Sequence, residues 1–151
     1  MTTREFIKKW YGNSTKERYC SSVMVSSNGT VYSYGFHYPL LFKVAGHDFI
    51  NTMGYSNTTA RHIRHAMDAV DYNYTAVELN RDDARTISSS WASDTDKLAV
   101  LLRATAEMVA NAQVACDAKK RKDTQVYHWL ADTLGKAQAS HIMVTNLMEG
   151  N

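Results

Sequence analysis

Two long amphipathic helical patterns, joined by a short basic segment, constrain the fold of this chain more than any other feature. Apolar residues repeat at helical spacing from Leu98 to Cys116, and again from Val126 to Met148. The basic segment at 119–122 suits a helix C-terminus, where cations interact favourably with the helix dipole. Two such helices with a short link are expected to form an antiparallel hairpin.

Both helices carry start signals. Ser93 is followed by Asp96 in an arrangement like a capping box, and Asp123 or Thr124 begins the second helix. Gly135 falls on the polar face of the second pattern. The helical period continues through Gly135, which predicts an unbroken helix at a cost of about 1 kcal/mol relative to alanine.

The first third of the chain carries strand signals separated by turns. The Asn28-Gly29 pair supplies the positive φ angles of a tight hairpin. Short connections predict antiparallel neighbours. The expected strands are Cys20–Ser26, Thr30–Tyr34, Leu40–Val44 and Asp48–Thr52.

The remaining segments are expected to be mainly helical. The expected elements are a helix over Arg4–Tyr11, a helix from Ser56 or Thr58 to about Val70, an extended stretch at Tyr74–Leu79, and a helix over Arg81–Ser90 capped by Asn80. The predicted fold is α+β: an antiparallel β-meander of about four strands, then helices, ending in a long antiparallel helical hairpin. One domain is expected, β-rich over 1–55 and α-rich over 56–151, with the hairpin covering the core face of the sheet.

The composition is typical of a globular protein. Of 151 residues, 44% are hydrophobic and 21% charged, and the net charge of +2 is too small to indicate nucleic-acid binding by itself. The N-terminus has no apolar run like that of a signal peptide, and no stretch reaches the ~18 apolar residues of a membrane span. Cys20 and Cys116 lack metal-ligand spacing and are expected to be separate thiols. The cytosol is the expected compartment.

The block from Tyr32 to His65 concentrates special residues: the only proline, three of seven glycines and four of six histidines. Gly35 permits a bend, and Pro39 fixes φ and removes a ladder donor, so a β-bulge or strand change is expected there. The functional alternative is that His37 is presented at the kinked strand.

The helix start at the end of this block is a candidate anion site, because exposed amides and arginines favour phosphate. Tyr55, Tyr72 and Tyr74 are candidates for stacking on bases. The alternative is that the arginines are solvated and the tyrosines fill the core edge. The candidate residues are Thr58, Thr59, Arg61, His62, Arg64 and His65.

Metal binding and catalysis have weaker support. His62, His65 and Asp68 share a helix face, but no third strong ligand is identifiable, so no metal and no cofactor are assigned. No G-x-S-x-G elbow or phosphate-cradling glycine loop occurs, so no catalytic residue is assigned. A small metal-dependent hydrolase built on His37 with the two helix histidines is the third functional hypothesis.

The basic segment has two interpretations: a solvated hairpin tip, or a contact with an acidic partner or nucleic acid. It comprises Lys119, Lys120, Arg121 and Lys122. Tyr127 and Trp129 lie beside the main stripe of the last helix. They favour a second apolar face and hence a homodimer.

The central block resembles a widespread group of small bacteriophage and mobile-element proteins. The resemblance covers roughly Val31–His65, under a quarter of the chain, and implies a phage-like origin and a host-cytosol setting but no activity. It is carried by Ser33, Tyr34, Gly35, His37 and Pro39, then by Tyr55, Ser56, Thr58, Thr59 and His62.

Small phage proteins of this kind often bind and block host defence machinery. The leading expectation is therefore a non-catalytic phage protein that binds a host protein or protein–nucleic acid complex, as an inhibitor of a host nuclease or defence complex. The alternative is a nucleic-acid-binding module that uses the helix start Thr58–His65.

Overall fold

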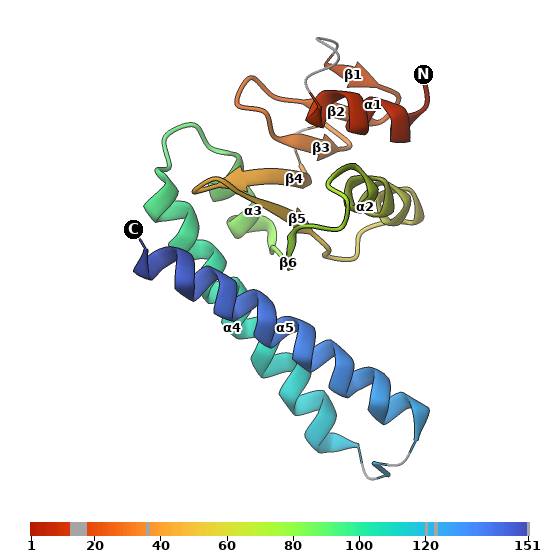
Figure 1. The fold of residues 1–151 in the computed structure, drawn as a ribbon, viewed down its shortest axis with the longest axis vertical. Helices are drawn as coiled ribbons and strands as arrows, with labels where there is room; N and C mark the ends of the chain where they lie inside the picture. Colours follow the sequence, from red (N-terminus) through yellow and green to blue (C-terminus); the bar gives the residue numbers. More distant parts are fainter. Residues whose placement is uncertain (13–17, 36, 120, 123, 151) are drawn as a thin grey trace.

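The computed structural model describes residues 1–12, 18–35, 37–119, 121–122 and 124–150. Its helices and strands follow one another along the chain as shown in Figure 1. They are α1 (Thr3–Tyr11), β1 (Tyr19–Cys20), β2 (Val23–Val25), β3 (Val31–Ser33), β4 (Pro39–Val44), β5 (His47–Asn51), α2 (Asn57–Ala69), β6 (Thr75–Val77), α3 (Arg81–Ser88), α4 (Asp94–Ala118) and α5 (Gln125–Glu149).

The six strands form one sheet in chain order, and the predicted α+β architecture is confirmed. Strands β1 to β5 pair antiparallel with their neighbours, whereas β6 pairs parallel with β5 after a crossover through α2. The expectation of about four strands was too low. Cys20–Ser26 is broken by a turn in which Ser21 has φ +56°, and the parallel pairing of β6 leaves no local signal in the sequence.

The turn between β2 and β3 contains the predicted Asn-Gly pair. Gly29 has φ +86°, and the amide of Ser26 donates to the carbonyl of Thr30. The Asn28 side chain accepts a 3.2 Å hydrogen bond from the amide of Thr30. The loop is longer than a two-residue turn, because Val25 and Val31 are the last paired residues.

The predicted irregularity at Pro39 is also present. Val31 pairs with Leu41 and Tyr32 with Pro39, which leaves Leu40 as an extra residue on β4. Just before the bulge, the hydroxyl of Tyr38 donates to the carbonyls of residues 51 and 53 at 2.8 and 2.6 Å. These bonds fix the start of β4 against the end of β5.

The sheet is buried on both faces, which corrects the expectation that the hairpin alone covers a single core face. On β5, Ile50 packs in a cluster with α1 and α2, whereas its neighbour Phe49 packs in a second cluster with α3, α4 and α5. Alternate strand residues point to opposite faces, so one strand serves both cores. Only the base of the hairpin covers the sheet.

The predicted helical hairpin is confirmed. Ser93 and Asp96 form a capping box at the start of α4, and Thr124 caps α5. Helix α5 runs through Gly135 without interruption. We call α4 and α5 together the arm; its outer part projects beyond the sheet in Figure 1. Within the described ranges, no helix combines the length and apolar character needed to cross a membrane.

Candidate functional site

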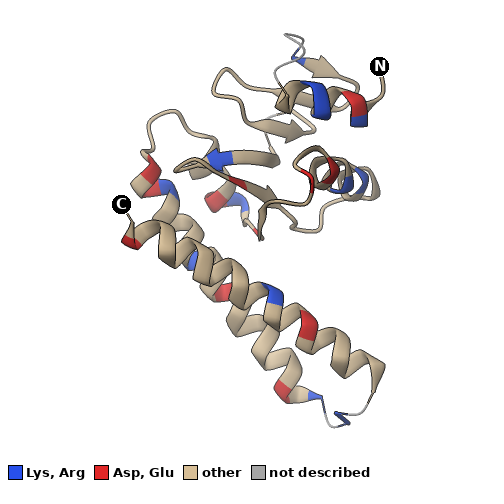
Figure 2. Cartoon of the chain, viewed as in Figure 1, with Lys and Arg blue, Asp and Glu red and all other residues tan. Residues whose placement is uncertain are grey.

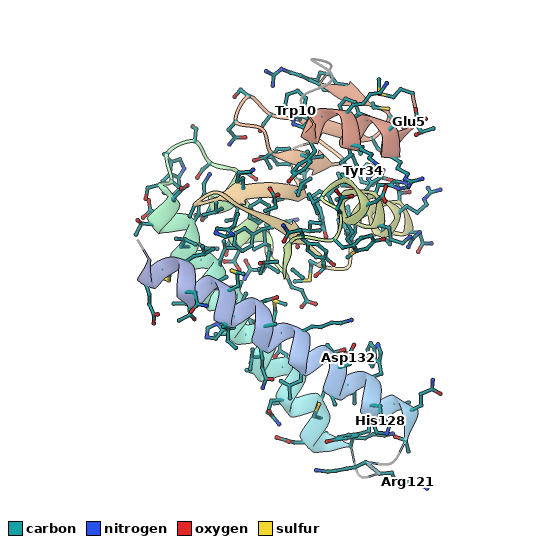
Figure 3. All side chains as sticks on the ribbon, in the orientation of Figure 1. Glu5, Trp10, Tyr34, Arg121, His128 and Asp132 are labelled. Atoms are coloured by element: carbon teal, nitrogen blue, oxygen red, sulfur yellow. The ribbon has the colours of Figure 1, made fainter. Side chains whose placement is uncertain are left out.

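A cleft of about 550 Å³ lies between the N-terminus of α1, the β1–β2 turn and α2. We call it the α2 cleft. Four of the predicted site residues are among those that line it, and Figure 3 shows Glu5 and Tyr34 in this part of the molecule. The lining residues are Thr2, Thr3, Arg4, Glu5, Ser21, Ser22, Thr58, Arg61, His62 and His65.

The start of α2 places these side chains as the sequence predicts. Ser56 is the N-cap, and its hydroxyl accepts a 3.0 Å hydrogen bond from the amide of Thr59. Residues three and four apart share a helix face, which brings Thr58, Arg61 and His65 to the cleft. The guanidinium of Arg61 donates to the Thr58 hydroxyl at 3.4 Å.

A chain of buried hydroxyl groups connects this N-cap to His62. The Ser56 hydroxyl donates to Thr59 Oγ1 at 3.0 Å, and Thr59 Oγ1 lies 3.2 Å from Ser33 Oγ. Ser33 Oγ lies 2.8 Å from His62 Nδ1. Ser33 and Thr59 are fully buried, and only 4% of His62 is exposed. Thr59 therefore lies beneath the cleft and supports it.

The direction of donation along this chain sets the tautomer of His62. Thr59 accepts the proton of Ser56, and either hydroxyl of the Thr59–Ser33 pair can donate to the other. We assign donation from Thr59 to Ser33 and from Ser33 to Nδ1 of His62, which continues the direction set by Ser56. Nδ1 is then an acceptor, and the imidazole proton lies on Nε2. Nε2 is 3.4 Å from the Ser22 hydroxyl, which lines the cleft. His62 thus presents a hydrogen-bond donor.

The same environment disfavours the charged imidazolium. Burial lowers the pKa of His62 below 6.5, with smaller contributions from His65 and Arg61. Burial also lowers the pKa of His65, and Arg4, Arg64 and Arg61 act in the same direction. Both imidazoles are therefore neutral at pH 7, and the positive charge of the cleft comes from arginine.

Arg4 connects α1 to α2 at the edge of the cleft. Its Nε lies 2.8 Å from Asp68 Oδ2, and this hydrogen bond is the main cause that lowers the pKa of Asp68. Asp68 is thus engaged with arginine, not aimed at an ion beside the histidines. Over the described parts of the chain, no group of three or more His, Cys, Asp or Glu side chains is arranged to hold a metal.

The geometry suits donation to an anion better than activation of a nucleophile. A serine nucleophile needs an unprotonated imidazole nitrogen facing it and a group that orients the other nitrogen through its N–H. With the protons assigned as above, Nε2 carries the proton toward Ser22, and Nδ1 accepts from Ser33. The cleft therefore offers hydroxyl, imidazole and guanidinium donors to a bound group.

A second cavity, of about 980 Å³, is lined by Tyr55. His37 lines this cavity together with Arg81 and Arg85, so the structure separates His37 from His62. A row of aromatic rings lies between the two cavities: the Tyr34 ring is 6.4 Å from Tyr55 and 6.2 Å from His62. A hydrolytic centre built on His37 and the α2 histidines would need these side chains in one cavity, and they line two different ones.

The other predicted site residues lie away from the α2 cleft. Arg64 is exposed on α2 and is not among the lining residues. Arg121 lies at the far end of the arm in Figure 3, near Lys119 and Lys122. Lys120 lies outside the described residues. The two groups of basic residues are therefore separate surfaces.

Sequence reasoning missed the cleft residues that come from other elements. Arg4 lies 64 residues from its partner Asp68, and Ser22 lies 40 residues from His62. No local pattern joins such distant positions. The only signal was the concentration of polar residues at the start of α2.

Comparison with known family models, curated proteins and solved structures gives no match for this chain. Its function is therefore inferred from its own residues.

Proposed function

We propose that the protein acts by binding, and that the α2 cleft recognises phosphate groups of a nucleic acid, either alone or within a host complex. The observation that carries the proposal is the placement of His62: its Nδ1 lies 2.8 Å from buried Ser33, and its Nε2 faces Ser22 in a cleft that Arg61 also lines. Guanidinium and neutral N–H donors together suit phosphate oxygens.

The surroundings of the cleft add a surface for bases. Tyr55 is 66% exposed and lines the second cavity, and Tyr34, 38% exposed, lies between Tyr55 and His62 of the α2 cleft. Arg81 and Arg85 line the second cavity beyond them. Alternation of cations with exposed aromatic rings is typical of surfaces that bind single strands, because bases stack on rings while arginines contact the backbone.

Fluorescence anisotropy with a labelled single-stranded oligonucleotide, measured over a salt series, tests the proposal. Arg61 lines the cleft, and Arg64 lies three residues further along the same helix, outside the lining. Replacement of both arginines by alanine is expected to weaken binding about tenfold at low salt. The slope of log K against log salt should also fall by about 0.7 for each lost phosphate contact.

The matched control is Lys119→Ala with Lys122→Ala, which removes the same charge from the far end of the arm. This variant is expected to bind like the wild type. If the two double variants lose affinity equally, binding is governed by net charge, and the α2 cleft is not the site. If neither variant differs from the wild type, the proposal is wrong.

A second candidate is favoured by the resemblance of Val31–His65 to phage proteins, because that block includes the start of α2. In this version the cleft contacts acidic side chains of a host nuclease or defence complex, and the protein inhibits it. Pull-downs from host lysate should then recover a partner with the wild type but not with the Arg61→Ala, Arg64→Ala variant. Equal recovery would contradict a role for the cleft.

A further inference from the structure

One face of α3 lines the second cavity. Arg81, Ala84, Arg85 and Ser88 all belong to the lining, and their spacing of three and four residues places them on the same side of the helix. A single helix face therefore supplies two arginines and a serine to this cavity.

The two arginines have no counter-charge within the cavity. No Asp or Glu is among the described residues that line it. Acidic residues do occur on α3, which carries both colours in Figure 2, but Asp83 pairs with Arg103 on α4. Glu78 and Asp82 are exposed and lie outside the lining. In the described parts of the chain, neither arginine of α3 forms an ion pair.

The position of Arg81 does not favour the helix that carries it. Arg81 is the first residue of α3, where the helix dipole disfavours a cation. Arg85 suits the last turn of this short helix, but two like charges four residues apart repel each other. A cation at a locally unfavourable position is expected where it has a partner outside its own helix.

The floor of the cavity is apolar and held in place. Leu79 and Met53 line it, and their amides donate to Oδ1 of Asn51 at 3.2 and 3.1 Å. The Tyr38 hydroxyl donates to the carbonyls of residues 51 and 53. The exposed Tyr55 ring also lines the cavity and lies 5.9 Å from the Tyr38 ring. The cavity thus combines a fixed floor, an exposed aromatic ring and two cations.

Ser88 adds a hydroxyl group that has no hydrogen-bond partner. Among the buried side-chain oxygen and nitrogen atoms of the described residues, its Oγ alone lacks one. A buried hydroxyl group without a partner lowers stability, so such a group calls for another role. Rotation about its one side-chain bond, χ1, allows the Ser88 hydroxyl to donate to a group in the cavity.

We propose that the second cavity binds a nucleotide through a phosphomonoester group. A phosphomonoester carries a charge of about −1.5 to −2 at pH 7, which two arginines match, whereas a phosphodiester inside a strand carries about −1. Ser88 donates to a third phosphate oxygen, and the base stacks on Tyr55. The cavity of about 980 Å³ is large enough for such a ligand. The proposal does not depend on what the α2 cleft binds.

Isothermal titration calorimetry with adenosine 5′-monophosphate (AMP) tests this site. The wild type is expected to bind AMP at least about tenfold more tightly than adenosine, which lacks the phosphate. Arg81→Ala with Arg85→Ala should abolish this preference. The matched control, Arg61→Ala with Arg64→Ala, removes the same charge from α2 and should bind AMP like the wild type. Equal affinities for AMP and adenosine, or equal losses in the two double variants, would overturn the proposal.

Ser88→Ala separates a binding role from a structural one. The substitution should weaken AMP binding about fivefold. It should leave the thermal unfolding midpoint unchanged or higher, because Ser88 Oγ has no hydrogen-bond partner to lose in the free protein. A variant that binds AMP like the wild type would refute the role assigned to Ser88.

The phosphomonoester can belong to a free mononucleotide or to the 5′ end of a strand. Anisotropy with 3′-labelled oligonucleotides, with and without a 5′-phosphate, distinguishes these sources. A preference for the phosphorylated strand that Arg81→Ala with Arg85→Ala removes assigns the strand end, and AMP binding without this preference assigns the free nucleotide. Tighter binding of phosphotyrosine than of AMP would contradict a nucleotide ligand. A wild type that neither binds AMP at millimolar concentration nor prefers the phosphorylated strand would disprove the site.

Discussion

Ser33 on β3 and His62 on α2 lie 29 residues apart in the chain, and their Oγ and Nδ1 atoms are 2.8 Å apart. This contact lies beneath the α2 cleft and links the sheet to the helix that lines it. With Ser33 assigned as the donor, this strand residue determines that the imidazole proton of His62 lies on Nε2. The hydrogen-bonding role of His62 in the cleft therefore depends on how α2 packs against β3.

The lowered pKa values of His62 and His65 predict acid sensitivity. The unfolded chain binds protons at these positions near pH 6.5, whereas the folded chain binds them only at lower pH. The contribution of these two histidines to the free energy of unfolding should therefore be constant above about pH 7. It should decrease as the pH falls from there toward pH 5. Urea denaturation at a series of pH values should show a smaller fall for His62→Gln than for the wild type.

The control for this measurement is His128→Gln, at an exposed position of α5. It should keep the pH dependence of the wild type. An unchanged dependence in His62→Gln would show that proton binding at the cleft does not contribute to stability.

Ser33→Ala should allow His62 to adopt both neutral tautomers. The variant removes the donor to Nδ1, and loss of this buried hydrogen bond should lower the free energy of unfolding by about 1–2 kcal/mol. Nitrogen NMR of the imidazole should show the Nε2–H tautomer in the wild type and a mixture in the variant. Ser22→Ala, which removes the longer 3.4 Å contact to Nε2, should leave the tautomer unchanged. The same mixture in wild type and Ser33→Ala would disprove the direction of donation.

The ion pair between Asp83 and Arg103 should be important for joining α3 to α4. Asp83 is 2% exposed, and the Arg103 side chain is 56% exposed. Arg103→Ala leaves a buried carboxylate unpaired and should cost about 2 kcal/mol, less than the ~3–5 kcal/mol of fully buried pairs because Arg103 is partly solvated. Thermal unfolding should show that adding Asp83→Asn recovers much of the loss. A double variant as unstable as the sum of both single variants would argue against coupling.

Asn51 should be required for the end of the sheet. It is 1% exposed, and its Oδ1 accepts from the amides of Met53 at 3.1 Å and Leu79 at 3.2 Å. Asn51→Ala leaves two amides without this acceptor and should lower the free energy of unfolding by about 2–3 kcal/mol. Asn57→Ala, at an exposed position of α2, is the matched control and should change stability by less than about 0.5 kcal/mol. Equal denaturation midpoints for both variants would contradict this role.

Local sequence signals were sufficient to predict most of the fold. Asn28-Gly29 marks its turn, and Asn80, Ser93 and Thr124 each cap the helix predicted to follow. The capping signals are reliable because each cap side chain accepts a hydrogen bond from a backbone amide only three residues further on. The hairpin of α4 and α5 followed from the same short-range pattern.

Long-range pairing was not predictable in the same way. Thr75–Val77 was expected to be extended, but its parallel partner on β5 lies across the whole of α2. For the same reason, Arg61 and His62 were predicted as site residues at the start of α2, whereas Arg4 and Ser22, which also line the cleft, were not. Their positions depend on how α1 and the β1–β2 turn pack, and apolar periodicity in one segment does not specify the packing of another.

The parallel pairing of β5 and β6 has a consequence for how the α2 cleft meets its ligand. Both ends of α2 are connected to neighbouring strands, and the body of α2 packs against α1 and the sheet. The cleft is therefore preorganised, because its helix cannot shift far without separating paired strands. Binding should therefore require little rearrangement of the backbone of α2.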